Sequence, residues 1–181
     1  MHAVTTTPDG ARGTPGRIIK VDHAGEFGAV NIYRAQIHIA RILYPALVPV
    51  LQNFLRHEKR HLSTFDAVLR RRGIARCKSY WFCGLGGYLL GFLTALFGKA
   101  GIMACTAAVE TVVLNHLEQQ LEYLKIEGDI EALKAVQGIV QEESEHKQVG
   151  VAQGKTSVFY RPPGAVVSAS TSLVIWLGMH L

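Results

Sequence analysis

The chain has 181 residues, of which 49% are hydrophobic and only 18% are charged, and its formal net charge is +5. That length suits one domain with a full hydrophobic core, and the apolar composition favours contact with a membrane. The positive charge favours anionic partners such as acidic lipid, but the basic residues lack the interleaved aromatic side chains of a single-strand binder, so nucleic acid is not an expected partner. Three cysteines, Cys77, Cys83 and Cys105, have no close pair, which predicts reduced thiols in an intracellular protein, most simply as small core residues.

Residues 1–16 are rich in Thr, Gly and Pro, which predicts a disordered tail without the apolar run of a secretory signal. Apolar residues then recur with helical spacing along the chain, and no strand pattern interrupts them. The expected helices cover residues 17–43, 46–72, 79–98, 101–126 and 130–150. A loop is expected at 151–163, and residues 164–181 are again apolar. We therefore expect an all-α fold and a single domain over 17–181.

Turn and cap residues support these helix boundaries. Pro45 separates the first two expected helices, because proline interrupts a helix that precedes it. Gly73 and Gly128 follow the second and fourth helices, where a left-handed residue often ends a helix. Asp129 stands where it can cap the fifth.

The pattern Glu-x-x-His occurs twice, and each copy is preceded by a lone glutamate, 32 residues earlier in one case and 33 in the other. The six residues are Glu26, Glu58, His61, Glu110, Glu143 and His146. Residues three apart stand on one face of a helix, so the carboxylate and the imidazole of each copy can grip the same metal pair. One carboxylate on each of two helices, with Glu-x-x-His on each of two others, is the pattern of a di-iron or di-manganese centre in a four-helix bundle.

The six residues also fall on the apolar faces of their expected helices. Glu58, for example, follows Leu51 and Leu55 at helical spacing, and Glu143 continues the face of Ile139. The alternative is that these are solvated faces, since most glutamates are exposed. Four carboxylates in a core would repel one another, whereas two divalent ions would balance them. Iron or manganese suits so oxygen-rich a set, while zinc more often takes fewer ligands.

The segment 79–98 reads SYWFCGLGGYLLGFLTALFG and contains no charged residue. It can be read as a helix lying in one leaflet, as a buried helix, or as a membrane span. A span would put Glu58 and Glu110 on opposite sides of the membrane, which a shared metal site forbids. An interfacial helix is favoured by the aromatic residues Tyr80 and Trp81 at its start and by a basic flank before it. That flank consists of Arg70, Arg71, Arg72, Arg76 and Lys78.

Four runs carry a family resemblance: RIIKVDHAGEFGAVNIYRAQ, HEKRHL, GKAGIMACTAAVE and EESEH. Together they resemble the demethoxyubiquinone hydroxylases over about residues 17–150. The resemblance implies a ferritin-like four-helix bundle with a di-iron centre and additional apolar, membrane-contacting helices. It also implies a flavin-independent, oxygen-dependent monooxygenase that hydroxylates the ring of a demethoxylated polyprenyl benzoquinone in ubiquinone biosynthesis. The same six residues are the metal ligands by this resemblance.

Further expectations follow from the resemblance. The cofactors are two Fe²⁺ ions, and dioxygen and NADH are co-substrates; because the chain has no Gly-x-Gly-x-x-Gly site, electrons are expected to reach the iron through the quinone. His116 matches a family histidine and is expected to lie just outside the metal ligands, while Leu117 stands where the family commonly has tyrosine. Glu26 and Glu110 are the ligands expected to shift when oxygen binds.

The expected partners are the polyprenyl quinone, an anionic membrane surface and other ubiquinone-biosynthesis proteins. The expected location is the cytoplasmic side of a bacterial inner membrane or, alternatively, the matrix side of the mitochondrial inner membrane. Two other functions fit parts of the sequence. A ferritin-like or rubrerythrin-type oxidase or storage protein would need a polar exterior, and a lipid-binding scaffold would have no use for six ligands.

Overall fold

The computed structural model describes residues 14–154, 168, 171 and 172. Within residues 14–154 it is entirely helical apart from short connections, so the all-α expectation is confirmed for the described part of the chain. The elements are α1 (Thr14–Leu43), the 3-10 turn η2 (Pro45–Leu47), α2 (Val48–Arg71), α3 (Tyr80–Leu96), α4 (Gly98–Glu127) and α5 (Ile130–Gly154).

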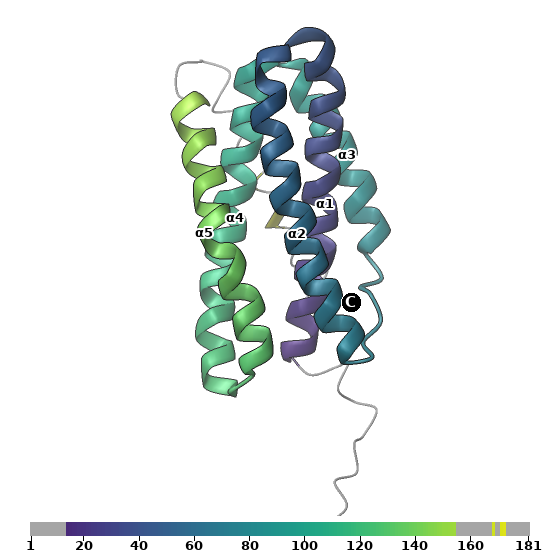
Figure 1. Ribbon diagram of the computed structural model, residues 1–181, viewed down its shortest axis with the longest axis vertical. Helices are drawn as coiled ribbons and strands as arrows, with labels where there is room; N and C mark the ends of the chain where they lie inside the picture. Colours follow the sequence, from purple (N-terminus) through teal and green to yellow (C-terminus); the bar gives the residue numbers. More distant parts are fainter. Residues whose placement is uncertain (1–13, 155–167, 169–170, 173–181) are drawn as a thin grey trace, which may run out of the picture.

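Four long helices, α1, α2, α4 and α5, lie side by side as a bundle, and α3 runs along the outer side of α1 (Figure 1). The bundle core has two apolar clusters at different heights along the helices. One cluster includes Ile19, Phe65, Leu69, Leu117, Leu124 and Ile139. The other includes Tyr33, Ile37, Leu51, Phe54 and Met103. On each of the four helices the predicted ligands fall between these two clusters, so a polar layer is enclosed by apolar packing above and below.

The predicted helix ends are largely where the turn residues place them. Gly73 and Gly128 adopt left-handed backbone angles, with φ of 63° and 72°, and they follow α2 and α4. The carboxylate of Asp129 accepts a hydrogen bond from the backbone N–H of Ala132 at 3.0 Å, which confirms it as the cap of α5.

Several boundaries differ from the expectation. The first helix begins at Thr14 rather than Arg17, which shortens the expected tail; the remainder of that tail lies outside the described residues. The last described helix continues to Gly154, so residues 151–154 are helical rather than loop. A side chain at Gly150 would come within 2.8 Å of the Ala107 backbone nitrogen, so glycine lets α5 continue in close contact with α4. The rest of the expected loop and most of 164–181 lie outside the described residues.

The helix α3 packs closely on α1 through glycine. A Cβ atom at Gly87 would lie 2.2 Å from the carbonyl oxygen of Gly28, and one at Gly91 would lie 2.3 Å from that of Ile32. The two backbones can approach this closely only because these positions of α3 carry no side chain. One face of the segment 79–98 is therefore buried against α1. Its other face is exposed, so the reading of this segment as a fully buried helix is excluded.

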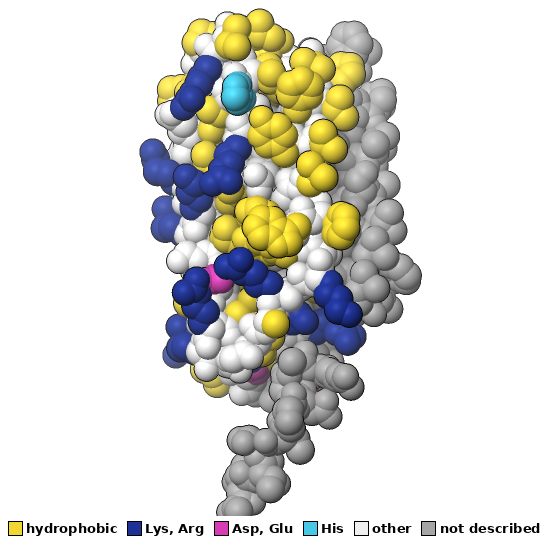
Figure 2. Space-filling view, turned by 90° about the vertical axis from the view of Figure 1, so that its right-hand side faces the viewer, with side chains coloured by type: hydrophobic (Ala, Val, Ile, Leu, Met, Phe, Trp, Pro, Cys, Tyr) yellow, Lys and Arg dark blue, Asp and Glu magenta, His cyan; other side chains and the backbone are white. Residues whose placement is uncertain are grey.

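That other face of α3 is a large exposed apolar surface (Figure 2). Trp81 is 70% exposed and Phe82 78%. We call this surface the α3 apolar face; its other exposed members are Leu85, Tyr88, Leu89, Phe92, Leu93, Leu96 and Phe97. A contiguous surface of this kind marks a site of contact with a partner or a membrane. Among the described helices, α4 is long and apolar enough to cross a membrane, but 67% of its most apolar stretch is buried inside the protein.

The five basic residues before α3 fall into two groups, three that precede Gly73 and two that lie close to α3. Arg70 pairs with Asp66 at 2.6 Å, Arg71 with Glu131 at 2.7 Å, and Arg72 with Asp129 at 2.6 Å. These three arginines are therefore neutralised by acids of α2 and of the start of α5. Arg76, which also pairs with Asp66 at 3.4 Å, and Lys78 are exposed beside α3.

We expect Arg72→Gln to lower the free energy of unfolding by about 1–2 kcal/mol at pH 7, because Arg72 makes two hydrogen bonds to the Asp129 carboxylate and a third to Glu131. The Arg72 guanidinium holds the pKa of Asp129 below its usual value. A lowered folded-state pKa stabilises the protein above the unfolded pKa, and the stabilisation is lost as pH falls through the folded pKa. Urea unfolding at pH 7 and pH 3 measures whether the difference from the parent shrinks in acid.

The matched control is Arg71→Gln. The Arg71 side chain is 59% exposed and forms one ion pair with Glu131, so we expect a change of less than about 0.5 kcal/mol. An equal loss of unfolding free energy in the two variants would show that the Arg72 contacts do not contribute more than the Arg71 contact to joining α2 to α5.

Candidate metal centre

The structure brings all six predicted ligands together in the polar layer. Each is at most 6% exposed. Their ligand atoms form two groups, and within each group the atoms lie within 4.8 Å of one another. One group is Glu26, Glu58, His61 and Glu143; the other is Glu58, Glu110, Glu143 and His146. The two groups share two carboxylates, which is the arrangement of two adjacent ion positions.

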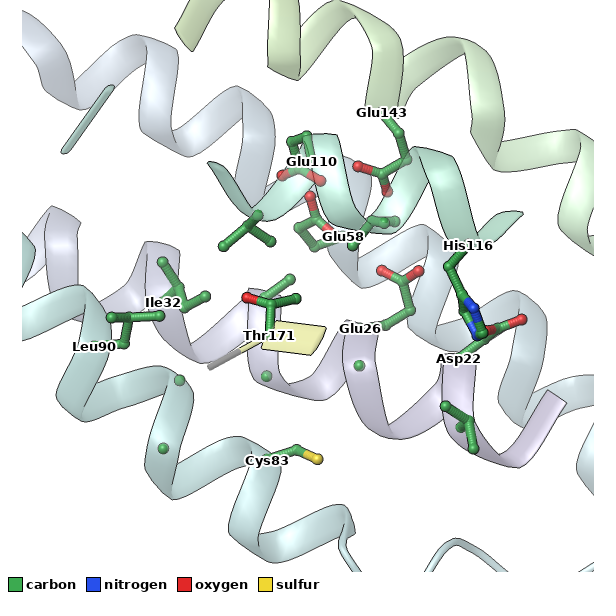
Figure 3. A pocket seen from close by; sticks show the side chains of 18 of the residues that line it. Asp22, Glu26, Ile32, Glu58, Cys83, Leu90, Glu110, His116, Glu143 and Thr171 are labelled. Carbon is green, nitrogen blue, oxygen red and sulfur yellow. The ribbon is translucent and has the colours of Figure 1, made fainter. Parts of the chain in front are cut away.

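The helices position these side chains simply. Each Glu-x-x-His pair shares one face of its helix, on α2 and on α5, while α1 and α4 each supply one glutamate. Figure 3 shows the carboxylates of Glu26, Glu58, Glu110 and Glu143 converging on a common space between the helices.

The two imidazoles pair crosswise with the carboxylates of the opposite copy of the motif. The Nδ1 atom of His61 lies 2.8 Å from Glu143 Oε1, and that of His146 lies 3.1 Å from Glu58 Oε1. Both histidines therefore direct Nδ1 into the cluster. The repeat in the sequence becomes an approximately symmetric pair of half-sites in space.

Burial dominates the electrostatics of the cluster. It raises the pKa of Glu26 and Glu110 well above the usual value, and the nearby charges of Glu58 and Glu143 act in the same direction. Burial alone would lower the pKa of His146, but contact with Glu143 and Glu58 outweighs it and raises that pKa to about 9. The cluster is therefore a place where positive charge is strongly favoured.

The donor set fits a pair of divalent metal ions. Four buried atoms facing the cluster make no well-directed hydrogen bond to the described residues, although both Nδ1 atoms lie close to carboxylate oxygens: Glu58 Oε1, His61 Nδ1, Glu143 Oε2 and His146 Nδ1. Unsatisfied buried polar atoms are rare in native proteins, and here they gather at one point. Four carboxylates and two imidazoles suit iron or manganese, and two dications would balance the four negative charges.

An outer layer, which sequence reasoning did not identify, holds the far side of both imidazoles. The Nε2 atom of His61 lies 2.8 Å from Glu142 Oε2, and that of His146 lies 3.1 Å from His57 Nδ1. Arg60 forms an ion pair with the same Glu142 carboxylate. A neutral ring that donates from Nε2 to these partners keeps its Nδ1 lone pair for a metal.

Tyr33 is a second contact missing from the predicted site. Its hydroxyl donates a hydrogen bond to Glu110 Oε1 at 3.0 Å, and its ring is buried in the apolar cluster above the site. The position was visible in the sequence, since Tyr33 lies seven residues after Glu26 on the same helix face. A tyrosine on an apolar face is ordinarily a core residue, however, so spacing alone did not assign it to the site.

A cavity of about 500 Å³ opens beside the carboxylates, between α1, α3 and α4. Its lining includes Phe82, Leu89 and Leu93 of the α3 apolar face and the four glutamates of the cluster. Figure 3 shows these glutamates between Ile32 and Leu90 on one side and Asp22 and His116 on the other. His116 also lines it, and no hydrogen bond joins His116 to any of the six predicted ligands. A largely apolar cavity with a few convergent polar groups is the usual form of a small-molecule site.

These features define a class: an α-helical bundle whose core encloses a carboxylate-rich site suited to two metals, with an apolar cavity beside it. Comparison with known proteins narrows the class to one family. The chain belongs to the family described as Ubiquinone biosynthesis protein COQ7, whose model matches residues 14–178. The resemblance seen in the sequence is thereby confirmed.

Relatives from several kingdoms match most of the chain. The NADPH-dependent 3-demethoxyubiquinone 3-hydroxylase of Dictyostelium discoideum is 32% identical over 91% of this chain and 76% of its own length. The 3-demethoxyubiquinol 3-hydroxylase of Rhodospirillum rubrum is 36% identical over 89% of this chain and 76% of its own length. The mitochondrial NADPH-dependent 3-demethoxyubiquinone 3-hydroxylase of Homo sapiens is 31% identical over 94% and 80%.

We expect Glu142→Ala to weaken metal binding by roughly 10–100-fold, because the carboxylate that orients His61 is lost. Glu142→Gln should lose less, since its amide oxygen can still accept from Nε2. Metal affinity is measured by competition with a chelator, and circular dichroism checks that helical content is kept. The control is Glu145→Ala, an exposed residue of α5 whose hydrogen bond is to Gln141. Equal affinities for the Glu142→Ala and Glu145→Ala variants would contradict an orienting role for Glu142.

Proposed function

We propose that this chain is an oxygen-dependent hydroxylase of the ring of a demethoxylated polyprenyl benzoquinone in ubiquinone biosynthesis. The observation that carries the proposal is the cavity that connects the α3 apolar face with the buried cluster of four carboxylates and two imidazoles. The relatives are named as hydroxylases of demethoxyubiquinone or demethoxyubiquinol, which is the same reaction class. A storage or rubrerythrin-type protein would have no use for a cavity that begins at an exposed apolar helix.

The shape and lining of the cavity suit a quinone with a hydrocarbon tail. Its volume of about 500 Å³ accommodates a substituted ring and the start of a tail. The polar end lies at the carboxylates, so the ring is placed there, and the tail extends past Leu89 and Leu93 toward the α3 apolar face. Water is excluded from most of the path because its walls are apolar.

Glu26, Glu58, His61, Glu110, Glu143 and His146 would hold two iron ions. The irons would supply the redox chemistry by which one atom of dioxygen enters the ring and the other leaves as water, with two electrons from a donor. Glu58 and Glu143 belong to both groups of ligand atoms and would fix the spacing of the pair. Glu26 and Glu110 each belong to one group, so each can change its contacts without disturbing the other half-site.

The electron donor is a reduced nicotinamide nucleotide. The sequence resemblance favours NADH, whereas the names of the Dictyostelium and human relatives specify NADPH. Initial rates measured with each nucleotide at the same concentration distinguish the two. No described segment supplies a separate nucleotide-binding domain, so the proposal retains electron delivery through the quinone itself.

The proposed location is a membrane surface, where the substrate tail resides. The α3 apolar face would enter the headgroup region, and the exposed basic residues beside it would contact anionic lipid. Arg76 and Lys78 lie just before α3, and Arg34 is an exposed basic residue of α1. Relatives named as mitochondrial and a bacterial relative both occur, so the membrane is either the mitochondrial inner membrane or a bacterial one.

We expect Glu143→Ala to reduce activity by more than the roughly 10–100-fold typical of losing an outer partner of a metal ligand, because it removes a carboxylate shared by both half-sites. His146→Ala should act in the same way. The parent should contain two irons per chain, and the variants fewer, at nearly unchanged helical content by circular dichroism. Glu145→Ala serves as the control on the same helix. Full activity in the Glu143→Ala variant would remove this residue from the metal site.

We expect replacement of Trp81, Leu85 and Leu96 by Ser to abolish most binding to vesicles that contain anionic lipid. These side chains are 70%, 63% and 53% exposed and do not line the cavity. Burying each side chain in the interface contributes on the order of 1 kcal/mol to binding, so the three replacements together should weaken binding strongly. The bound fraction is measured by co-sedimentation with vesicles. The control replaces Ile126 and Ile130, which are exposed near the α4–α5 connection, far along the chain from α3. Equal effects of both sets would mean that the α3 apolar face has no particular part in binding.

A further inference from the structure

The cavity contains a second polar pole besides the carboxylate cluster. Asp22 and His116 both line the cavity, and neither belongs to the ligand groups. Asp22 is only 8% exposed, and one of its carboxyl oxygens accepts a hydrogen bond from Gln120 Nε2 at 2.7 Å. Its other oxygen, Oδ2, is buried and has no hydrogen-bond partner among the described residues. The same is true of His116 Nε2.

The two side chains face the same region of the cavity from different helices. Asp22 lies on α1, and His116 lies on α4 one turn before Gln120, the residue that contacts Asp22. Figure 3 shows Asp22 and His116 together at the end of the cavity beside Glu26, with Ile32 and Leu90 toward the other end. Asp22 precedes Glu26 by four residues, which is about 6 Å along the helix. That separation is comparable to the size of a benzoquinone ring.

Two unsatisfied polar atoms in the cavity, apart from the carboxylate cluster, indicate a ligand oxygen. A buried donor or acceptor without a partner destabilises the protein, whereas a ligand that supplies the missing hydrogen bond gains affinity from it. A ring carbonyl oxygen has two lone pairs and can accept from two donors at once. The methyl and prenyl substituents of a quinone offer no such group, and a methoxy oxygen is a weaker acceptor than a carbonyl oxygen, so the match is to a ring oxygen.

We propose that Asp22 and His116 bind one ring oxygen of the quinone and thereby fix which ring carbon faces the carboxylate cluster. This inference rests on the proposed function and adds the orientation of the substrate. Burial raises the pKa of Asp22 to about 7, so a protonated carboxyl group is present near neutral pH to donate to a carbonyl oxygen. Burial also lowers the pKa of His116, which keeps the imidazole neutral with one N–H to donate.

The competing explanation is purely structural: the Asp22–Gln120 bond would only join α1 to α4. The chain offers a matched control for that explanation. Gln36 of α1 donates a hydrogen bond to Thr94 of α3 at 3.3 Å, and both are buried and absent from the cavity lining. Gln36→Leu therefore removes a buried bond between helices without touching the cavity.

The experiment compares iron-loaded Asp22→Leu, Asp22→Asn and Gln36→Leu with the parent. The dissociation constant of a short-tailed demethoxylated benzoquinone is measured by titration, together with iron content, melting temperature, kcat and KM. We expect Asp22→Leu to keep two irons but to bind the quinone about 10-fold more weakly, the effect of one lost hydrogen bond. Asp22→Asn should recover most of the affinity, because its amide accepts from Gln120 and donates to the ring oxygen. Gln36→Leu should lower the melting temperature but leave the dissociation constant unchanged.

His116→Ala gives a second, independent variant. It should retain iron, bind the quinone more weakly and react more slowly, and products of both His116→Ala and Asp22→Leu should include hydroxylation at a second ring position, detected by mass spectrometry. Parent-like affinity and a single product in the Asp22→Leu variant would overturn the inference while leaving the proposed function intact. Equal weakening by Gln36→Leu would also overturn it. Failure of the parent itself to bind or hydroxylate the quinone would overturn the proposed function as well.

Discussion

The mutual repulsion of four buried carboxylates is the constraint on which the rest of this structure depends. Glu26, Glu58, Glu110 and Glu143 are each at most 6% exposed and share one layer of the bundle. Without positive charge between them, four ionised groups would not remain together in a medium of low dielectric constant. Protons can supply part of that charge: burial disfavours the ionised form of Glu26 and Glu110 and thereby raises the pKa of each. Two dications supply all of it. The apolar clusters on either side keep the layer closed, and packing on that scale outweighs the local cost of the polar groups.

Much of this site could be predicted from the sequence, because two simple periodicities carry the information. The apolar stripe placed each of the six predicted ligands on a buried face, and the i, i+3 spacing placed Glu and His together. The outer layer was not predictable in this way. His57 and Glu142 each immediately precede a predicted ligand, and adjacent residues on a helix do not share a face. Each contacts an imidazole on the other helix, His57 of α2 at His146 of α5 and Glu142 of α5 at His61 of α2, so only the packing of these helices reveals them. The partners of Arg71 and Arg72 are about 60 residues away in the chain, so only the packing of α2 on α5 reveals them.

The segment 79–98 shows a different limit. Its composition predicted an apolar helix but not which face would be buried. The answer lies in the glycines: Gly87 and Gly91 let α3 approach α1 backbone to backbone, and Gly84 makes room for the ring of Phe27. Apart from Tyr80, which is buried, the large side chains of the segment are left for the cavity wall or for the outside. Phe82, Leu89 and Leu93 line the cavity and are also exposed, so the same helix forms part of the entrance and part of the outer apolar face.

The two half-sites are alike in sequence, but their surroundings make the polar layer asymmetric. The cavity touches all four carboxylates and neither of the ligand histidines. The imidazoles lie on the opposite side, where Glu142 and His57 hold their Nε2 atoms. One side of the layer is therefore held firmly by an outer set of polar contacts, and the other side presents carboxylate oxygens to an apolar space. A carboxylate can rotate between one and two contacts at little cost, whereas an imidazole held at Nε2 has a fixed orientation. On the proposed function, Glu26 and Glu110, which are free to rearrange, face the substrate, and the two histidines held at Nε2 face away from it.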